Sequence, residues 1–302
     1  MKIAALYTCF NRKAKTLSSI KSLFESLDDY NNKATESIDI EVFLTDDGCS
    51  DGTAAAIRET FPNRVIHILQ GNGNLYWAGG MRLAWNEALI RHKEWQYYLL
   101  LNDDTLILNR CIMEILSAEA YSKKTYNREG IISGITCSSS DPEIITYGGD
   151  VIVNRLTGKT IRLGKSKTPR LVDMTNANIL LVPSAVVDEI GTFCKGYIHS
   201  TADVDYSMWA RRHKIPVLIT SEACGVCEND HHDADVDYQR IIKKTRAERK
   251  SYYNNPLHSS RDYLTFVKRN MPLRYPLSWF FSIMKINIPG LYFFINKHKL
   301  NS

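Results

Sequence analysis

The sequence predicts an α/β fold with a mostly parallel central sheet and helices on both faces. In the first hundred residues, apolar segments typical of buried strands alternate with segments whose apolar residues recur at helical spacing. Each apolar segment ends in polar residues, and parallel sheets bind ligands at the carboxyl ends of their strands. Strands that alternate with helices form a parallel sheet that is covered on both sides.

Four strands are expected in this first part of the chain. They cover residues 2–9, 39–45, 64–69 and 97–101, and each is a short run of mainly apolar side chains. Polar residues follow each strand, so a single pocket would collect them at one edge of the sheet. Helices are expected over 14–27, from Asp51 or Thr53 onward, and from the glycine-rich stretch 71–80 to about His92.

The second half of the sequence has a different pattern. Alternating residues and two turn signals predict a β-hairpin within 144–163. A strand is expected at 178–183 and a helix at 201–213. Two further strands are expected at 216–220 and 223–227, and the chain becomes helical from about residue 234.

The charge is divided unevenly along the chain. The formal net charge is +5, but residues 1–239 hold 25 basic and 31 acidic side chains, whereas residues 240–302 hold 13 basic and two acidic ones. The protein is therefore an acidic body with a basic tail. Such a tail suggests an anionic partner, either a membrane surface or a nucleic acid.

The sequence also predicts a compartment. Seven scattered cysteines do not form the pattern of a disulfide framework, and we expect reduced thiols in a cytoplasmic protein. The apolar run at residues 3–10 is short and leads directly into polar residues, so it predicts a first strand and not a signal peptide. The longest apolar stretch, residues 276–295, is interrupted by Lys285 and Pro289 and is not a transmembrane segment.

Two acidic motifs follow predicted strands. Asp103 and Asp104 suit Mg²⁺, which takes oxygen ligands and uses one or two carboxylates together with a diphosphate. Asp46 and Asp47 have carboxylates that can accept hydrogen bonds from a nucleobase or a ribose. Alternatively, both motifs are acidic turns that cap the helices after them.

The glycine-rich stretch 71–80 is neither a Walker A loop nor a dinucleotide-binding fingerprint. No Gly-Lys-Ser/Thr follows it, which disfavours P-loop chemistry. Gly79 and Gly80 would let the backbone approach a ligand closely, and Arg82 is placed to meet a phosphate.

Two later clusters have several interpretations. Asp203 and Asp205 would not share a helix face, so Asp203 would face the cleft while Asp205 caps the helix or pairs with an arginine; alternatively, both favour a helix start. Cys224 and Cys227 with the nearby His231 and His232 lack the separation between ligand pairs that a zinc site has. One of the two histidines would still complete a metal site formed elsewhere.

Taken together, these motifs resemble glycosyltransferase family 2, the inverting enzymes of the Rossmann-like GT-A fold, over about residues 2–230. The stretch 45–53 is similar to the family's D-D-G-S-x-D-G-T signature, with Cys49 as an extra residue. The stretch 74–80 resembles N-x-G-x-A-G-G, although Tyr76 replaces the first glycine. Leu101 to Thr105 resembles the L-N-x-D form of the DxD motif, and Ala202 replaces the glutamate of E-D-x-D.

The resemblance implies a domain organisation and residue roles. It implies a GT-A catalytic domain at 1–233, with a nucleotide-binding half at 1–105 and an acceptor-binding half at 106–233, before a helical extension at 234–302. Asp203 would be the general base, and Asp104 would bind Mg²⁺ or Mn²⁺ with His231 or His232 as a further ligand. The donor, a nucleoside-diphosphate sugar, would be bound by Thr8, Phe10, Arg12, Asp46, Asp47, Asn74, Trp77, Gly80, Arg82, Asn102 and Asp103.

The acceptor would be a saccharide or a lipid-linked molecule, as in the rhamnosyltransferase-like enzymes that make bacterial surface polysaccharides. The basic, aromatic-rich region 240–302 suits peripheral contact with the inner face of the plasma membrane, or alternatively a homodimer contact. A sugar nucleotidyltransferase is a second hypothesis, which the absence of glycine from residues 9–13 disfavours. A nucleic-acid-binding protein is a third, and it lacks a recognisable binding motif, so we expect no nucleic-acid partner.

Overall fold

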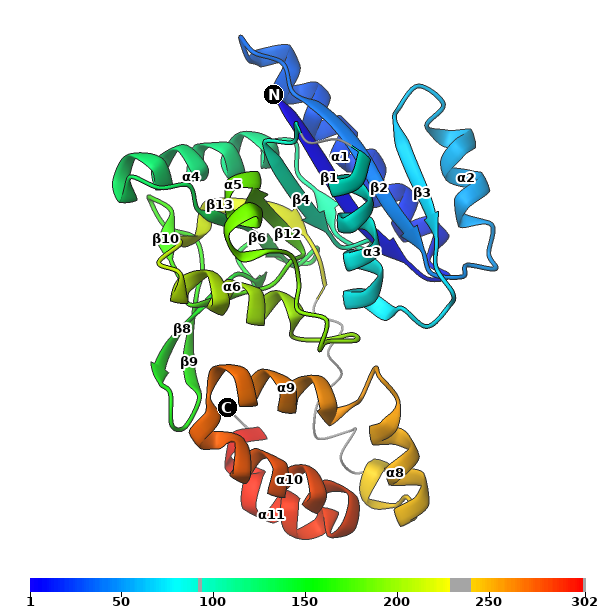
Figure 1. The fold of residues 1–302 in the computed structure, drawn as a ribbon, viewed down its shortest axis with the longest axis vertical. Helices are drawn as coiled ribbons and strands as arrows, with labels where there is room; N and C mark the ends of the chain where they lie inside the picture. Colours follow the sequence, from blue (N-terminus) through cyan, green and yellow to red (C-terminus); the bar gives the residue numbers. More distant parts are fainter. Residues whose placement is uncertain (92–93, 229–239, 301–302) are drawn as a thin grey trace.

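The computed structural model describes residues 1–91, 94–228 and 240–300, and they form a central sheet, a small second sheet and a group of C-terminal helices (Figure 1). The order of the central sheet is β10-β13-β6-β12-β4-β1-β2-β3. Its strands are β1 (Lys2–Cys9), β2 (Asp39–Asp46), β3 (Ile66–Gln70), β4 (Tyr97–Leu101), β5 (Leu106–Ile107), β6 (Ile131–Cys137), β7 (Ile145–Tyr147), β10 (Arg170–Leu171), β12 (Ile179–Pro183) and β13 (Val217–Val226).

The long strands of this sheet run mostly in one direction. β3, β2, β1 and β4 are parallel to one another, and β6 and β13 are parallel to each other. β12 is antiparallel to both β4 and β6, which places β6 and β13 in the same direction as β1. The structure therefore confirms the predicted α/β class with a mostly parallel sheet.

Helices cover both faces of the sheet because the side chains of each strand alternate between two cores. In β1, Ala4 and Leu6 pack on one face and Ile3, Ala5 and Tyr7 on the other. One face is covered by α3 (Tyr76–Arg91), α5 (Ser184–Ile190) and α6 (Ala202–Arg212), and the other by α1 (Lys13–Lys33), α2 (Thr53–Thr60) and α4 (Cys111–Tyr126).

The predicted hairpin within 144–163 is present as β8 (Gly149–Asn154) and β9 (Lys159–Leu163), which form a small sheet with β11 (Met174–Thr175). Two boundaries differ from the prediction. The two strands expected at 216–220 and 223–227 are one strand, β13, whose pairing with β6 shifts register between Ile219 and Gly225. The helix α3 begins at Tyr76, so Gly79 and Gly80 lie within its first two turns and not in a loop.

Gly80 is needed where α3 crosses the sheet. A Cβ atom at this position would lie 2.8 Å from the Cβ of Thr8 in β1. The Thr45 hydroxyl donates a hydrogen bond to the Gly80 carbonyl (2.8 Å). The helix therefore packs closely against β1 and β2 just where these strands end.

The C-terminal helices lie together at the end of the molecule farthest from β1, and α9 is the one nearest to α6 (Figure 1). Phe266, Val267 and Met271 join the same core as α6. The expected domain boundary at 233/234 lies outside the described residues. The helices are α8 (Arg246–Asn254), α9 (Ser260–Asn270), the 3-10 helix η1 (Pro272–Arg274), α10 (Tyr275–Asn287) and α11 (Pro289–Leu300).

None of the helices formed by the described residues combines the length and apolar character that a membrane crossing requires.

Candidate functional site

A cavity of about 440 Å³ opens where β1, β2 and β4 end. Parallel strands present their carboxyl ends at one edge of the sheet, so residues that are far apart in sequence meet there. Most of the lining residues lie within the predicted nucleotide-binding half at 1–105. His199 and Leu257, from the second half of the chain, also line the cavity. Six of the residues predicted to bind a donor line it: Thr8, Phe10, Arg12, Asp47, Trp77 and Asp103.

Arg12 joins the two carboxylates that follow β4. Its Nη1 donates to Asp103 Oδ1 (3.2 Å) and to Asp104 Oδ2 (2.8 Å). Asp103 is only 7% exposed. Burial raises the pKa of Asp103 to about 6, against the opposing effect of the Arg12 charge. The guanidinium therefore offsets part of the negative charge of the acidic pair, of which Asp103 lines the cavity.

Asp47 holds the glycine-rich stretch in place. Its Oδ1 accepts from the Gly73 N–H, and its Oδ2 accepts from the N–H groups of Leu75 and Tyr76, each at 2.9 Å. Asp46, for which binding of the donor base is predicted, accepts from the Cys49 N–H (2.7 Å) and closes a turn. Both carboxylates are buried, and both shape the loops that border the cavity.

The remaining predicted donor residues do not line this cavity. Asn102 Oδ1 accepts a hydrogen bond from the indole N–H of Trp77 (2.8 Å), which connects the end of β4 to α3. Asn74 is exposed on the loop. Arg82 donates to the carbonyls of Cys194 (3.2 Å) and Tyr197 (2.9 Å), so its guanidinium supports the loop before α6.

Asp203 lies in the first turn of α6 and is buried. Its Oδ2 accepts from the Ala177 N–H (2.9 Å) and its Oδ1 from the Val204 N–H (2.8 Å). Burial raises the pKa of Asp203 above its usual range, and these two hydrogen bonds oppose that change. Asp203 is not among the residues that line the cavity.

Asp205 pairs with an arginine, Arg269, as the sequence predicted. Arg269 Nε lies 3.0 Å from its Oδ1, and the Asn270 side-chain amide donates to the same oxygen (2.6 Å). Both partners come from α9. The start of α6 is therefore fixed to the C-terminal helices.

Five cavity residues had no place in the predicted site: Cys9, Gly73, Tyr76, His199 and Leu257. The rings of Tyr76 and His199 meet edge to face at 6.2 Å, and burial lowers the pKa of His199 below its usual value. His199 lies in the loop before α6, and Leu257 lies between α8 and α9. Nothing in the sequence indicated that Leu257 lines the same cavity as residues of β1.

The loop that carries His199 is held by one buried side chain of α9, Asp262. Its Oδ2 accepts from the N–H groups of His199 (2.7 Å), Ser200 (2.9 Å) and Ile198 (3.2 Å). Asp262 is 1% exposed. A carboxylate that accepts several backbone hydrogen bonds in a buried setting fixes the loop strongly.

The acidic pair fits a divalent cation of the predicted kind. Mg²⁺ uses one or two protein carboxylates and takes other oxygens from water and a diphosphate, and Asp103 and Asp104 offer such oxygens beside the cavity. Within the described residues, no group of three or more His, Cys, Asp and Glu side chains is arranged to hold a metal. The proposed further ligands, His231 and His232, lie outside the described residues.

Fold and cavity together define a mixed α/β protein with a cavity at the carboxyl ends of parallel strands. Solved structures of S. aureus TarS have this fold. The form spanning residues 1–349 of TarS aligns with a TM-score of 0.53 and 14% identity, over 95% of this chain and 75% of TarS 1–349. Its complexes with UDP-GlcNAc and with UDP align with TM-scores of 0.52 and 0.53, at 15% identity and over 89% of this chain.

Sequence comparison gives a weaker result. No protein-family model matches the chain. A geranylgeranyl pyrophosphate synthase of Gibberella zeae is 25% identical over 177 residues, which is 57% of this chain and 45% of that protein. The chain thus spans less than half of this relative, and it covers 43% of the longer TarS structure.

Proposed function

We propose that the chain is a metal-dependent inverting glycosyltransferase that moves a sugar from a nucleoside-diphosphate sugar to a hydroxyl of a saccharide or lipid-linked acceptor. The observation that carries this proposal is the cavity at the ends of β1, β2 and β4, where aromatic rings, a guanidinium and paired carboxylates meet. The UDP and UDP-GlcNAc complexes of the similar TarS structure support a nucleotide-sugar donor.

Residues 1–105 form the proposed nucleotide-binding half and residues 106–233 the acceptor-binding half. Thr8 and Phe10 would border the nucleotide, and Phe10 offers an exposed ring for stacking on a base. Arg12 would exchange part of its contact with the acidic pair for the diphosphate, because a guanidinium binds phosphate oxygens in the same geometry as carboxylate oxygens.

Asp203 would act as the base. It would take the proton of the acceptor hydroxyl while the hydroxyl oxygen forms its bond to the anomeric carbon. The bond from that carbon to the diphosphate breaks on the opposite side, and its electron pair leaves with the nucleoside diphosphate. Asp103 and Asp104 would hold Mg²⁺ or Mn²⁺, which supplies positive charge to offset the charge on the leaving diphosphate.

The resemblance to glycosyltransferase family 2 and to its rhamnosyltransferase-like members suggests a role in bacterial surface-polysaccharide synthesis at the cytoplasmic side of the membrane. The C-terminal region would bring the active site to its acceptor. It would do so either by peripheral contact with the bilayer or by joining two copies of the chain.

Calorimetry with UDP-, dTDP- and GDP-sugars, with and without MnCl₂, tests the proposal. We expect tight binding of one donor only with the metal, and at least a tenfold weaker binding after Asp104→Asn. Asp39→Asn is the matched control. Asp39 is the first residue of β2, at the end of the strand away from the cavity, so this variant should bind as the wild type does. Unchanged binding after Asp104→Asn, or release of pyrophosphate from a nucleoside triphosphate, would exclude this function.

Transfer is tested separately from binding. Asp203→Asn should leave donor affinity within about twofold while transfer falls by 10²-fold or more, as removal of a general base does. The anomeric configuration of the product, measured by NMR, should be opposite to that of the donor. Retention of configuration would exclude the single-displacement mechanism.

A further inference from the structure

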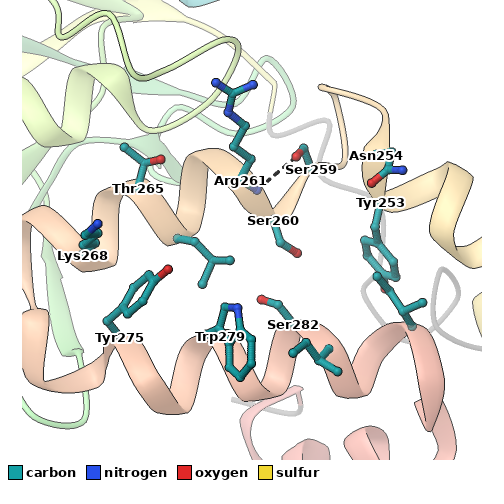
Figure 2. Close-up of a pocket in the computed structure, with 13 residues that line it drawn as sticks. Tyr253, Asn254, Ser259, Ser260, Arg261, Thr265, Lys268, Tyr275, Trp279 and Ser282 are labelled. Carbon is teal, nitrogen blue, oxygen red and sulfur yellow. Dashed lines mark hydrogen bonds between the residues drawn. The ribbon is translucent and has the colours of Figure 1, made fainter.

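A second cavity, of about 510 Å³, lies among α8, α9 and α10, away from the carboxyl ends of β1 and β4. Figure 2 shows that the side chains of Ser260, Tyr275, Trp279 and Ser282 point into the space between α9 and α10. Lys268 also lines this cavity and places its ammonium group 5.9 Å from the centre of the Tyr275 ring. The cavity thus combines hydroxyl groups, aromatic surface and a cation, which suits a ligand with both an anionic and an apolar part.

The same helices carry exposed apolar side chains. On η1 and α10, Leu273, Leu277 and Phe280 follow one another at the spacing of one helix face, and Leu273 is 82% exposed. On α11, Phe294 is 78% exposed and Leu291 is also exposed. Soluble proteins seldom expose clustered apolar side chains of this size unless the surface contacts a partner or a membrane.

The charges of this region indicate which partner fits. Residues 240–302 hold 13 basic and two acidic side chains. Of the two acidic side chains, Asp262 is buried under the loop at 198–200, and Glu248 forms a capping box with Thr245 at the start of α8. The exposed surface of the C-terminal helices is therefore both cationic and apolar.

We infer that the face formed by η1, α10 and α11 lies on an anionic bilayer and that the cavity between α9 and α10 receives the phosphate-bearing head of a lipid. Apolar side chains would enter the boundary between head groups and acyl chains, while basic side chains would be attracted to the anionic lipid phosphates. A symmetric contact between two copies would instead press this cationic surface against itself, which is unfavourable.

The inference deepens the proposed function, on which it rests for the nature of the acceptor. Leu257, which precedes α9, lines the donor cavity, and Asp262 of α9 holds the loop of His199. Contact of these helices with a bilayer would therefore bring the donor cavity close to lipid-linked acceptors.

Co-sedimentation of the full chain with vesicles tests the inference. We expect binding to vesicles of phosphatidylglycerol and phosphatidylcholine, weakening as NaCl is raised, and at least tenfold weaker binding to pure phosphatidylcholine. Leu273→Glu and Phe294→Glu should each reduce the partition coefficient at least tenfold. Ile90→Glu on α3, whose side chain is 77% exposed, is the matched control and should bind as the wild type does.

The cavity is tested by Lys268→Glu, which should weaken binding to anionic vesicles about fivefold or more. Inorganic phosphate at 10 mM should not displace the chain from the vesicles. Displacement would show that the cavity binds free phosphate and would overturn its assignment to a lipid head group. Three further results would overturn the inference: equal binding to both kinds of vesicle, no effect of Leu273→Glu and Phe294→Glu, or a dimer that these substitutions dissociate. Donor calorimetry on the same variants should be unchanged, so failure here is distinct from failure of the proposed glycosyltransferase.

Discussion

Replacing Asp262 by alanine should loosen the loop at 198–200 without removing any residue that lines the donor cavity. The carboxylate is 1% exposed and is the acceptor for the N–H groups of Ile198, His199 and Ser200. A buried donor that loses its partner costs about 1–3 kcal/mol. Because the three donors share one carboxylate, we expect a total loss of about 3–5 kcal/mol in the local stability of this loop.

Amide hydrogen exchange measures this loss at the residues concerned. A change of about 3 kcal/mol in the opening free energy corresponds to roughly 10²-fold faster exchange at 198–200. Asp262→Asn keeps one acceptor oxygen and should show a smaller increase. His199 lines the proposed donor cavity, so donor affinity should fall more in Asp262→Ala than in Asp262→Asn.

The control is Glu248→Ala, which removes the other acidic side chain of residues 240–302. It breaks the capping box at Thr245, and its effect on stability should be confined to α8. Exchange at 198–200 should not change. If Asp262→Ala raises exchange at 198–200 by less than about threefold, the reasoning that this carboxylate fixes the loop is wrong.

Three further changes have definite expected outcomes. Asp47→Ala removes the acceptor of three loop N–H groups and should weaken donor binding at least tenfold by calorimetry, and an unchanged affinity would contradict this. Gly80→Ala places a Cβ 2.8 Å from the Thr8 Cβ and should cost about 1–3 kcal/mol in urea unfolding, whereas Gly290→Ala, with open space around it, should not destabilise. Burial raises the pKa of Asp203, and a base acts only when deprotonated, so kcat should rise with pH through a pKa above that of an ordinary aspartate; a flat profile down to pH 4 would exclude this role.

The sequence was sufficient to predict the sheet and the edge of the sheet at which the cavity lies. β1 and β4 are buried on both faces, and continuous apolar runs are typical of strands in a covered parallel sheet, so the runs predicted where these strands lie. Thr8, Asp47 and Asp103 were then expected at one edge because parallel strands end there, and the structure places all three on one cavity. This inference needed only local pattern and a rule of topology.

The roles of individual side chains were less accessible from the sequence. Asp46 and Asp47 are adjacent and chemically identical, yet Asp46 closes a turn while Asp47 holds the loop from Gly73 to Tyr76. Arg82 follows the glycine-rich stretch but reaches the carbonyl groups of Cys194 and Tyr197. Which partner a polar side chain finds depends on the distances between separate elements, which residue spacing does not specify.

The α/β class, the ends of β1, β2 and β4 that meet at the cavity, and the acidic pair beside it all followed from the sequence alone. The contacts of α9 came only from the tertiary structure: α9 fixes the start of α6 through Asp205 and the loop before it through Asp262, and Leu257 lines the cavity at the strand ends. Strand and helix patterns arise from neighbouring residues along the chain, whereas these contacts join residues more than 50 positions apart. They form because packing of α9 against α6 brings buried polar groups within hydrogen-bonding distance, and such groups are stable only when they are paired.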